Sequence, residues 1–246
     1  MMATALLLLD GCGKGNLRQG ELMAPMPSAH HRAPSAQRRG HVPIPLRLDA
    51  ARAAAFASAV NLKAADVTGS KVTPRSRDPE QEHEAEKCGA GGSAPVGGGS
   101  SPKLDRGTGL EHEAISSSIV VLPSPKLARA DFSYASSKAG LACYGKALSK
   151  SLEGEASAGV QLGHLRLQKL KLTGTEGVQS SGIRISARVS STSSSLSVGL
   201  YIDAVGFLYG PAEIQIYATS FVQPEPLRTE QELLGLLDQR ALLNRL

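Results

Sequence analysis

The sequence has no tryptophan, and aromatic residues make up only 4% of its 246 positions. It also has no apolar run that approaches the about 18 residues needed to span a membrane as a helix. The first apolar run, residues 3–9, has no positively charged stretch before it and ends at Asp10. A secretory signal peptide normally has such a charged stretch. We therefore expect neither a membrane span nor a signal peptide.

Cysteine is scarce as well. The three cysteines, Cys12, Cys88 and Cys143, lie far apart and form no Cys-x-x-Cys pair. Neither a disulfide framework nor a zinc site is therefore predicted, and a reducing, cytoplasmic compartment is expected, with an organelle as the alternative. His112 stands between two glutamates without a second histidine at ligand spacing, so we interpret this segment as a solvated charge run rather than a metal site.

Acidic residues are absent from residues 23–48, where four arginines contribute to a net charge of +5. Such a stretch can contact phosphate, but a nucleic-acid-binding surface normally combines its cations with aromatic side chains or a known module. Residues 23–48 contain no Phe, Tyr or Trp. We therefore expect no nucleic-acid partner.

Hydrophobic periodicity predicts a succession of strands and helices. Strands are predicted at 3–9, 42–48, 62–67, 115–122, 160–172, 183–189 and 214–217, and helices at 50–60, 134–152 and 229–246. Asp49 is the predicted N-cap of the helix at 50–60. The polar segment from 69 to 110, with its glycine and serine tract, is interpreted as a flexible connection.

Three short segments have the composition of a nucleotide-binding fold. Residues 10–17, D-G-C-G-K-G-N-L, follow the first predicted strand. A glycine-rich loop at that place turns tightly and lets a pyrophosphate approach backbone N–H groups at the start of a helix. Residues 65–68 are A-D-V-T and end another predicted strand, and residues 88–91 are C-G-A-G.

The fourth segment is the most specific. The predicted strand 115–122 leads to Ser124, and Tyr134-Ala-Ser-Ser-Lys138 begins the predicted helix that follows. A tyrosine and a lysine four positions apart lie on one face of a helix. An ammonium group beside a phenol makes the phenol a better proton donor, which suits general acid or base catalysis.

In this order, the four segments resemble the short-chain dehydrogenase/reductase family. The resemblance implies an α/β fold: a Rossmann-like, doubly wound, mostly parallel sheet with helices on both faces, interrupted by low-complexity loops. It implies one such domain over residues 1–222, with flexible inserts at about 23–40 and 69–110, and a helical extension at 223–246.

The resemblance implies an NAD(P)-dependent oxidoreductase that transfers hydride between a nicotinamide cofactor and a small carbonyl or alcohol substrate. Ser124 would bind the substrate oxygen, Tyr134 would exchange the proton, and Lys138 would bind the nicotinamide ribose. Further cofactor contacts would come from Gly11, Lys14, Gly15, Arg47, Asp66, Val67, Ala90 and Gly91. Because cations suit a 2′-phosphate, Lys14 and Arg47 favour NADP, with NAD as the alternative.

Two departures from the family pattern leave a second hypothesis open. Leu17 replaces the third glycine of the loop, and no asparagine lies between Asn61 and Asn244 to act as the family's catalytic asparagine. The alternative is a catalytically impaired relative that serves as a binding or structural subunit. Residues 92–109 are also too short and too glycine-rich for the helix that often forms the family's dimer face, so the usual oligomer is not expected.

Overall fold

The computed structural model describes residues 48–74, 88, 94–156, 160–173, 179–193 and 195–246. Residues 1–47 lie outside the described residues. The strand predicted at 3–9 and nearly all of the strand predicted at 42–48 therefore lie outside them.

The described chain folds around one nine-stranded sheet in the order β1-β3-β4-β9-β8-β7-β5, in which β2 also pairs with β4 and β6 with β7. The strands are β1 (Lys71–Thr73), β2 (Gly97–Ser100), β3 (Lys103–Arg106), β4 (Glu113–Val121), β5 (Val160–Leu162), β6 (Arg166–Leu170), β7 (Ser180–Ser191), β8 (Ser197–Tyr209) and β9 (Ala212–Phe221). Every pairing among these strands is antiparallel.

The predicted Rossmann-like, mostly parallel sheet is therefore wrong, and with it the identification as a Rossmann nucleotide-binding oxidoreductase. Parallel strands need a crossover of a dozen or more residues, usually a helix, whereas antiparallel strands can be joined by a tight turn. The chain passes from β8 to β9 through Gly210 and Pro211 alone, and Gly210 takes a φ of 58° there. Among the described residues, no helix lies between β7 and β8 or between β8 and β9.

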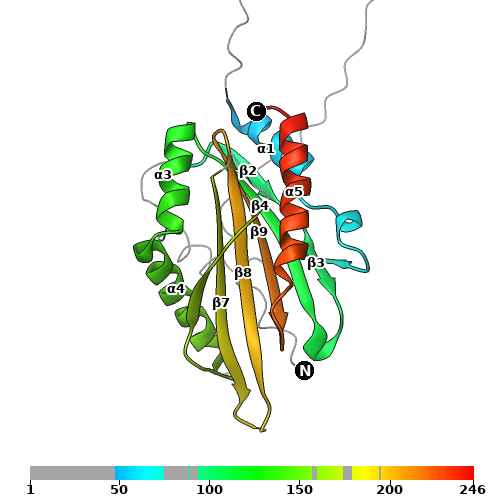
Figure 1. Ribbon diagram of the computed structural model, residues 1–246, viewed down its shortest axis with the longest axis vertical. Coiled ribbons are helices and arrows are strands. Elements are labelled where there is room, and N and C mark those ends of the chain that lie inside the picture. Colours follow the sequence, from blue (N-terminus) through cyan, green and yellow to red (C-terminus); the bar gives the residue numbers. More distant parts are fainter. Residues whose placement is uncertain (1–47, 75–87, 89–93, 157–159, 174–178, 194) are drawn as a thin grey trace, which may run out of the picture. The chain divides into compact units, whose positions relative to one another are not determined.

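Four α-helices accompany the sheet in the described chain: α1 (Ala50–Val60), α3 (Pro125–Ala135), α4 (Lys138–Ala156) and α5 (Leu227–Leu243). Two 3-10 turns are η1 (Ala64–Asp66) and η2 (Gly109–Glu111). In Figure 1, α3 and α4 lie to the left of the long strands β7 and β8, and α5 lies to their right. The strand predicted at 62–67 is wrong, because η1 occupies that segment.

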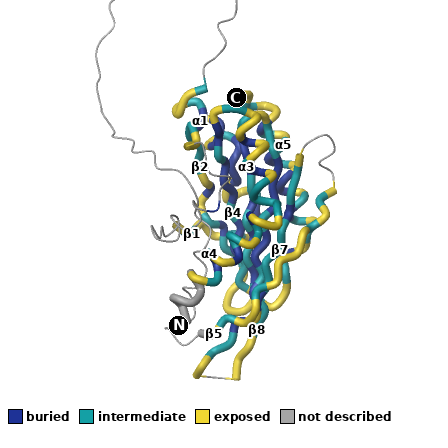
Figure 2. Tube along the Cα trace, turned by 90° about the vertical axis from the view of Figure 1, so that its left-hand side faces the viewer, coloured by how far each residue is buried: buried dark blue, intermediate teal, exposed yellow. Residues whose placement is uncertain are grey.

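The main core lies between the sheet and the helices α1 and α5. Alternate residues of β4, β8 and β9 point to this face, because successive side chains of a strand point to opposite sides. The sheet contributes Leu104, Ile115, Ile119, Val121, Val205, Phe207, Ile214 and Ile216, and the helices contribute Phe56, Val60, Leu233, Leu234 and Leu237. We call this side the α5 face. In Figure 2 the buried residues concentrate around β2 and β4, and the start of β8 is exposed.

A smaller core lies on the opposite side, which we call the α4 face. It joins Leu148 of α4 to Val189, Leu200 and Ile202 of β7 and β8. Helix α3 contacts β8 and β9 on the same side, where Ala128 and Phe132 are its buried residues. The sheet is thus covered by helices on both faces.

Within the glycine and serine tract, Gly97–Ser100 form strand β2 and pair with β4, so this part of the tract belongs to the sheet. At Gly97 a Cβ atom would lie 3.0 Å from the Cβ of Ala53, and at Gly99 it would lie 3.3 Å from the Cβ of Ala57. Glycines in β2 and alanines on one side of α1 therefore let helix and strand approach closely. Strands β1, β2 and β3 all fall within the segment 69–110 that was predicted to be a flexible insert.

Candidate functional site

The three residues predicted to be catalytic do not form one site. Ser124 is the N-cap of α3, and its hydroxyl oxygen accepts a hydrogen bond of 3.3 Å from the backbone N–H of Leu127. Tyr134 lies in the last turn of that same helix, whereas Lys138 begins α4 and is exposed. Tyr134 and Lys138 therefore do not share a helical face.

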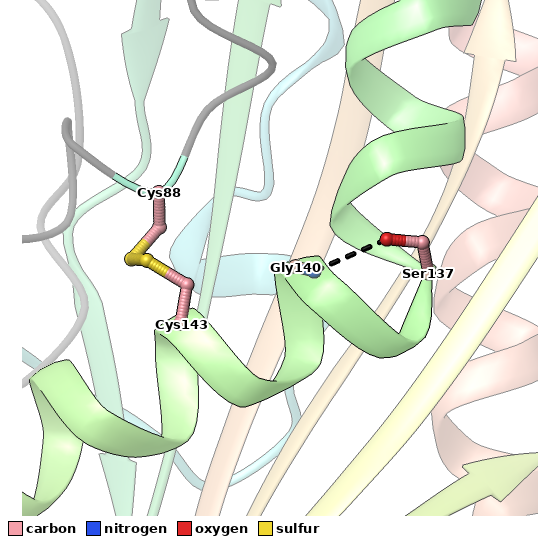
Figure 3. Close-up of a disulfide and its surroundings, with 4 residues drawn as sticks. All are labelled: Cys88, Ser137, Gly140 and Cys143. Carbon is pink, nitrogen blue, oxygen red and sulfur yellow. Dashed lines mark hydrogen bonds between the residues drawn. A yellow bond between two sulfur atoms is a disulfide. The ribbon is translucent and has the colours of Figure 1, made fainter.

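Two serines between Tyr134 and Lys138 explain why the predicted single helix is two helices. Ser136 ends α3, and the Ser137 hydroxyl accepts a hydrogen bond of 3.1 Å from the backbone N–H of Gly140 in the first turn of α4 (Figure 3). Serine favours such caps because its side chain competes for backbone hydrogen bonds. Gly140 is also needed here, since a Cβ atom would lie 2.2 Å from the Tyr134 carbonyl oxygen.

Asp66, predicted to contact adenine, is bound to α5 instead. Arg240 donates hydrogen bonds of 2.7 Å to each of its carboxylate oxygens, and the backbone N–H of Lys63 donates another of 2.7 Å. Burial alone would raise the pKa of Asp66, but the hydrogen bonds from Arg240 and Lys63 outweigh it and the pKa is lowered. The neighbouring Val67 is buried in the main core. Asp66 thus joins η1 to α5, and Val67 packs in the core.

The remaining predicted cofactor contacts, Gly11, Lys14, Gly15, Arg47, Ala90 and Gly91, lie outside the described residues. Within the described residues, no group of three His, Cys, Asp or Glu side chains is placed to hold a metal ion. None of the helices there combines the length and the apolar character needed to cross a membrane.

A disulfide joins Cys88 to Cys143 on α4, which corrects the expectation that the cysteines form no such bond (Figure 3). The two Cα atoms lie 5.6 Å apart, and 55 positions separate the two residues in the sequence. Cys88 is 1% exposed. The bond ties the segment between β1 and β2 to the helix that covers the α4 face.

A cluster of charged side chains lies at the start of α5. On neighbouring strands, Arg184 binds Asp203 through hydrogen bonds of 2.7 and 2.5 Å, and it donates a further one of 3.0 Å to the Glu225 carbonyl. Arg106 donates to Glu113 and, at 2.6 Å, to the Glu225 carboxylate. Asp203 and Glu225 are 1% and 2% exposed. The two guanidinium groups and their carboxylate partners thereby hold the segment before α5 against four strands, β3, β4, β7 and β8.

Glu230, in the first turn of α5, completes this cluster without a hydrogen-bond partner for either carboxyl oxygen among the described residues. It is 0% exposed. Burial, followed by the interaction with the neighbouring Asp203 carboxylate, which favours a protonated Glu230, raises the pKa of Glu230 to about 9. Glu230 therefore carries its proton at neutral pH, which limits the net negative charge of the buried cluster.

On the opposite, α4 face, Glu213 of β9 is a further buried acid, apart from the cluster at the start of α5. It is 4% exposed, and its Oε1 atom has no hydrogen-bond partner among the described residues. Burial raises the pKa of Glu213 to about 8, and the negative charge of Asp131 on α3 adds to this. Glu213 could not be found from the sequence, because β9 alternates apolar and polar residues, and such alternation predicts a solvent-exposed polar side.

The titration of Glu213 predicts a pH-dependent stability. From the ordinary pKa of 4.5 up to about 8, folded Glu213 keeps a proton that the unfolded chain releases. The free energy of unfolding should therefore fall as pH rises through this window. The glutamine in Glu213→Gln stays neutral at every pH. We therefore expect the free energy of unfolding of this variant to match that of the wild type near pH 5. Near pH 9 it should exceed the wild-type value by a few kcal/mol, on the order of the energy that corresponds to the pKa shift of Glu213.

Urea unfolding of the wild type and Glu213→Gln across this pH range measures the effect. Glu232→Gln is the control, because Glu232 is an exposed acid of α5 with 64% of its side chain accessible. We expect the control to follow the wild-type curve. Parallel curves for the wild type and Glu213→Gln would show that Glu213 titrates normally in the folded protein.

Comparison with known proteins gives no family. No family model matches the chain, and no match was found among the curated proteins. Among solved structures, the extracellular domain of PknH from Mycobacterium tuberculosis is similar over 56% of this chain and 61% of that domain, with 10% identity and a TM-score of 0.28. At this level the likeness carries no functional information.

Proposed function

We propose that this chain is a non-catalytic binding domain that acts in an oxidising compartment, outside the cytosol. The Cys88–Cys143 disulfide carries the proposal. Disulfides persist in oxidising compartments and are rare where glutathione and thioredoxin keep thiols reduced. The expectation of a cytoplasmic location was based on cysteine spacing alone, which did not indicate this disulfide.

The structural roles of the residues that were predicted to be catalytic or to bind the cofactor support the non-catalytic part of the proposal. The Ser124 hydroxyl caps a helix, Asp66 holds α5, and Lys138 starts a different helix from the one that ends near Tyr134. Hydride transfer and NADP binding stay predictions from the sequence, and an antiparallel sheet lacks the strand ends at which doubly wound folds bind dinucleotides.

The location can be tested by producing the full chain in one bacterial host with and without an added export signal. The cells are quenched and denatured with acid, and free thiols are then alkylated under denaturing conditions with a maleimide that shifts mobility on a gel, because Cys88 is buried in the folded protein. Of the three cysteines, two form the disulfide, so we expect only Cys12 to react in the exported protein and all three to react in the cytosolic protein. Three reactive thiols in the exported protein would contradict the proposal.

Titration with NADPH and NADH tests the non-catalytic part separately. We expect the cofactor fluorescence to stay unchanged on addition of the exported, oxidised protein. Saturable binding that is lost in Tyr134→Phe or Lys138→Met would instead support the oxidoreductase hypothesis.

A further inference from the structure

One edge of the sheet is strongly basic. Strands β5 and β6 both pair with the outer side of β7, and β6 has no other partner among the described strands. Six exposed basic residues surround β6, and we call them the β6 basic edge: Lys146, His164, Arg166, Lys169, Lys171 and Arg188. Residues 160–173 and 179–193 contain no Asp or Glu. The positive charge of this edge is therefore not neutralised from within its own strands.

The cations of the β6 basic edge project to both sides of the sheet. Arg166 pairs in register with Ser186, two positions from Arg188, so these two arginines share the α5 face. Lys169 alternates to the other face, together with Leu167. An anionic ligand that lies along β6 can thus meet a cation on either side.

Helix α4 carries a further exposed cation next to the residue at which it packs on β6. A Cβ atom at Gly145 would lie 3.6 Å from Cδ1 of Leu167, so α4 passes directly over β6 at this point. Lys146 follows Gly145 in the helix and is exposed. Lysines that lie only on an edge strand can be explained as protection against edge-to-edge aggregation. This explanation does not apply to Lys146, which lies on α4, or to Arg188, which lies on the inner strand β7.

We infer that the β6 basic edge binds an extended, acidic polypeptide segment of a partner protein, which adds to the sheet as a strand beside β6. An edge strand offers unpaired backbone N–H and C=O groups, and a peptide can satisfy them by strand addition. The exposed side chains of β6 from Arg166 to Lys169 leave this edge accessible. Cations on both faces favour a strand, whose side chains alternate between faces, over a flat anionic surface. The inference rests on the proposed binding function and names its partner class.

The test uses the oxidised full chain and a fluorescein-labelled, twelve-residue peptide of alternating Glu and Thr. We expect saturable binding by fluorescence anisotropy that weakens steeply with salt, and no binding of the corresponding Lys and Thr peptide. The charge reversal Lys169→Glu/Lys171→Glu should weaken binding by about tenfold or more.

The matched control is Lys63→Glu/Lys71→Glu. It makes the same change in net charge at two exposed lysines near β1, the opposite edge strand. We expect this variant to bind within about twofold of the wild type, since exposed charges farther apart than about 10 Å are largely screened at 0.1 M salt. Equal weakening in both variants would overturn the inference, because binding would then follow net charge alone.

Peptides that are N-methylated at either set of alternate residues separate strand addition from simple charge attraction. A strand pairs with one neighbour through the N–H groups of every second residue. We expect one methylated peptide to lose binding and the other to keep it. Equal binding of both, or binding to phosphatidylglycerol vesicles without binding to the peptide, would overturn the inference. If the exported chain forms its disulfide but the peptide does not bind, the partner class fails while the proposed compartment stands.

Discussion

Cys88→Ser/Cys143→Ser is expected to lower the free energy of unfolding by about 4 kcal/mol, the value that loop-closure entropy gives for a bond between residues 55 positions apart. The bond restricts the unfolded chain more than the folded one, so its loss stabilises the unfolded state. Urea unfolding of the oxidised wild type and the double variant measures the difference.

Reduction provides an independent check on this effect. Dithiothreitol should lower the stability of the wild type to that of Cys88→Ser/Cys143→Ser and should leave the double variant unchanged. Cys12→Ser is the control, and we expect its unfolding midpoint to lie at the same urea concentration as that of the wild type. A double variant as stable as the oxidised wild type would show that the disulfide does not hold the folded domain.

Arg184→Met is expected to destabilise the fold by about 3–5 kcal/mol, the usual cost of removing one partner of a buried ion pair. Asp203 is 1% exposed and would lose both hydrogen bonds from the guanidinium group. The Glu225 carbonyl would lose a third. The midpoint of thermal or urea unfolding at pH 7 reports the effect.

The unpaired charge, rather than the lost packing of the arginine, is the expected cause. Arg184→Met/Asp203→Leu should therefore recover most of the stability, because it leaves no buried carboxylate unpaired. Arg228→Met breaks an exposed ion pair with Glu232, in which 88% of the arginine side chain is accessible, and we expect a change below about 1 kcal/mol. A double variant less stable than Arg184→Met would contradict this explanation.

Elements whose signals are local were predicted well from the sequence. The helix at 50–60 is confirmed as α1, and Asp49 accepts a hydrogen bond of 2.9 Å from the Arg52 N–H as its N-cap. The strand at 115–122 and the C-terminal helix at 229–246 are confirmed as β4 and α5 within a few residues. Each depends on neighbours in the sequence: a cap, a run of β-branched residues, or a leucine stripe.

The fold could not be predicted because strand pairing is not a local property. A glycine loop and a Tyr-x-x-x-Lys pattern occur on this chain, but neither determines whether successive strands run parallel. The glycines of β2 illustrate the same limit. Their composition is typical of a linker, but they pair with β4 as a strand and pack closely against the alanines of α1.

The site was missed for related reasons. Arg106 and Glu225 meet across 119 positions, and Cys88 and Cys143 across 55, so their spacing gives no sign that they are partners. The basic edge is different, because the absence of acidic residues from 160–173 is visible in the sequence. Its place at an open sheet edge became evident only with the topology.

Peptide mapping of the exported protein under non-reducing conditions tests the central claim most directly. After alkylation of free thiols and proteolysis, mass spectrometry should find the peptide containing Cys88 linked to the peptide containing Cys143, with Cys12 alkylated. Alkylation of all three cysteines, or a link from Cys12 to either of the others, would contradict an extracytoplasmic domain closed by this disulfide.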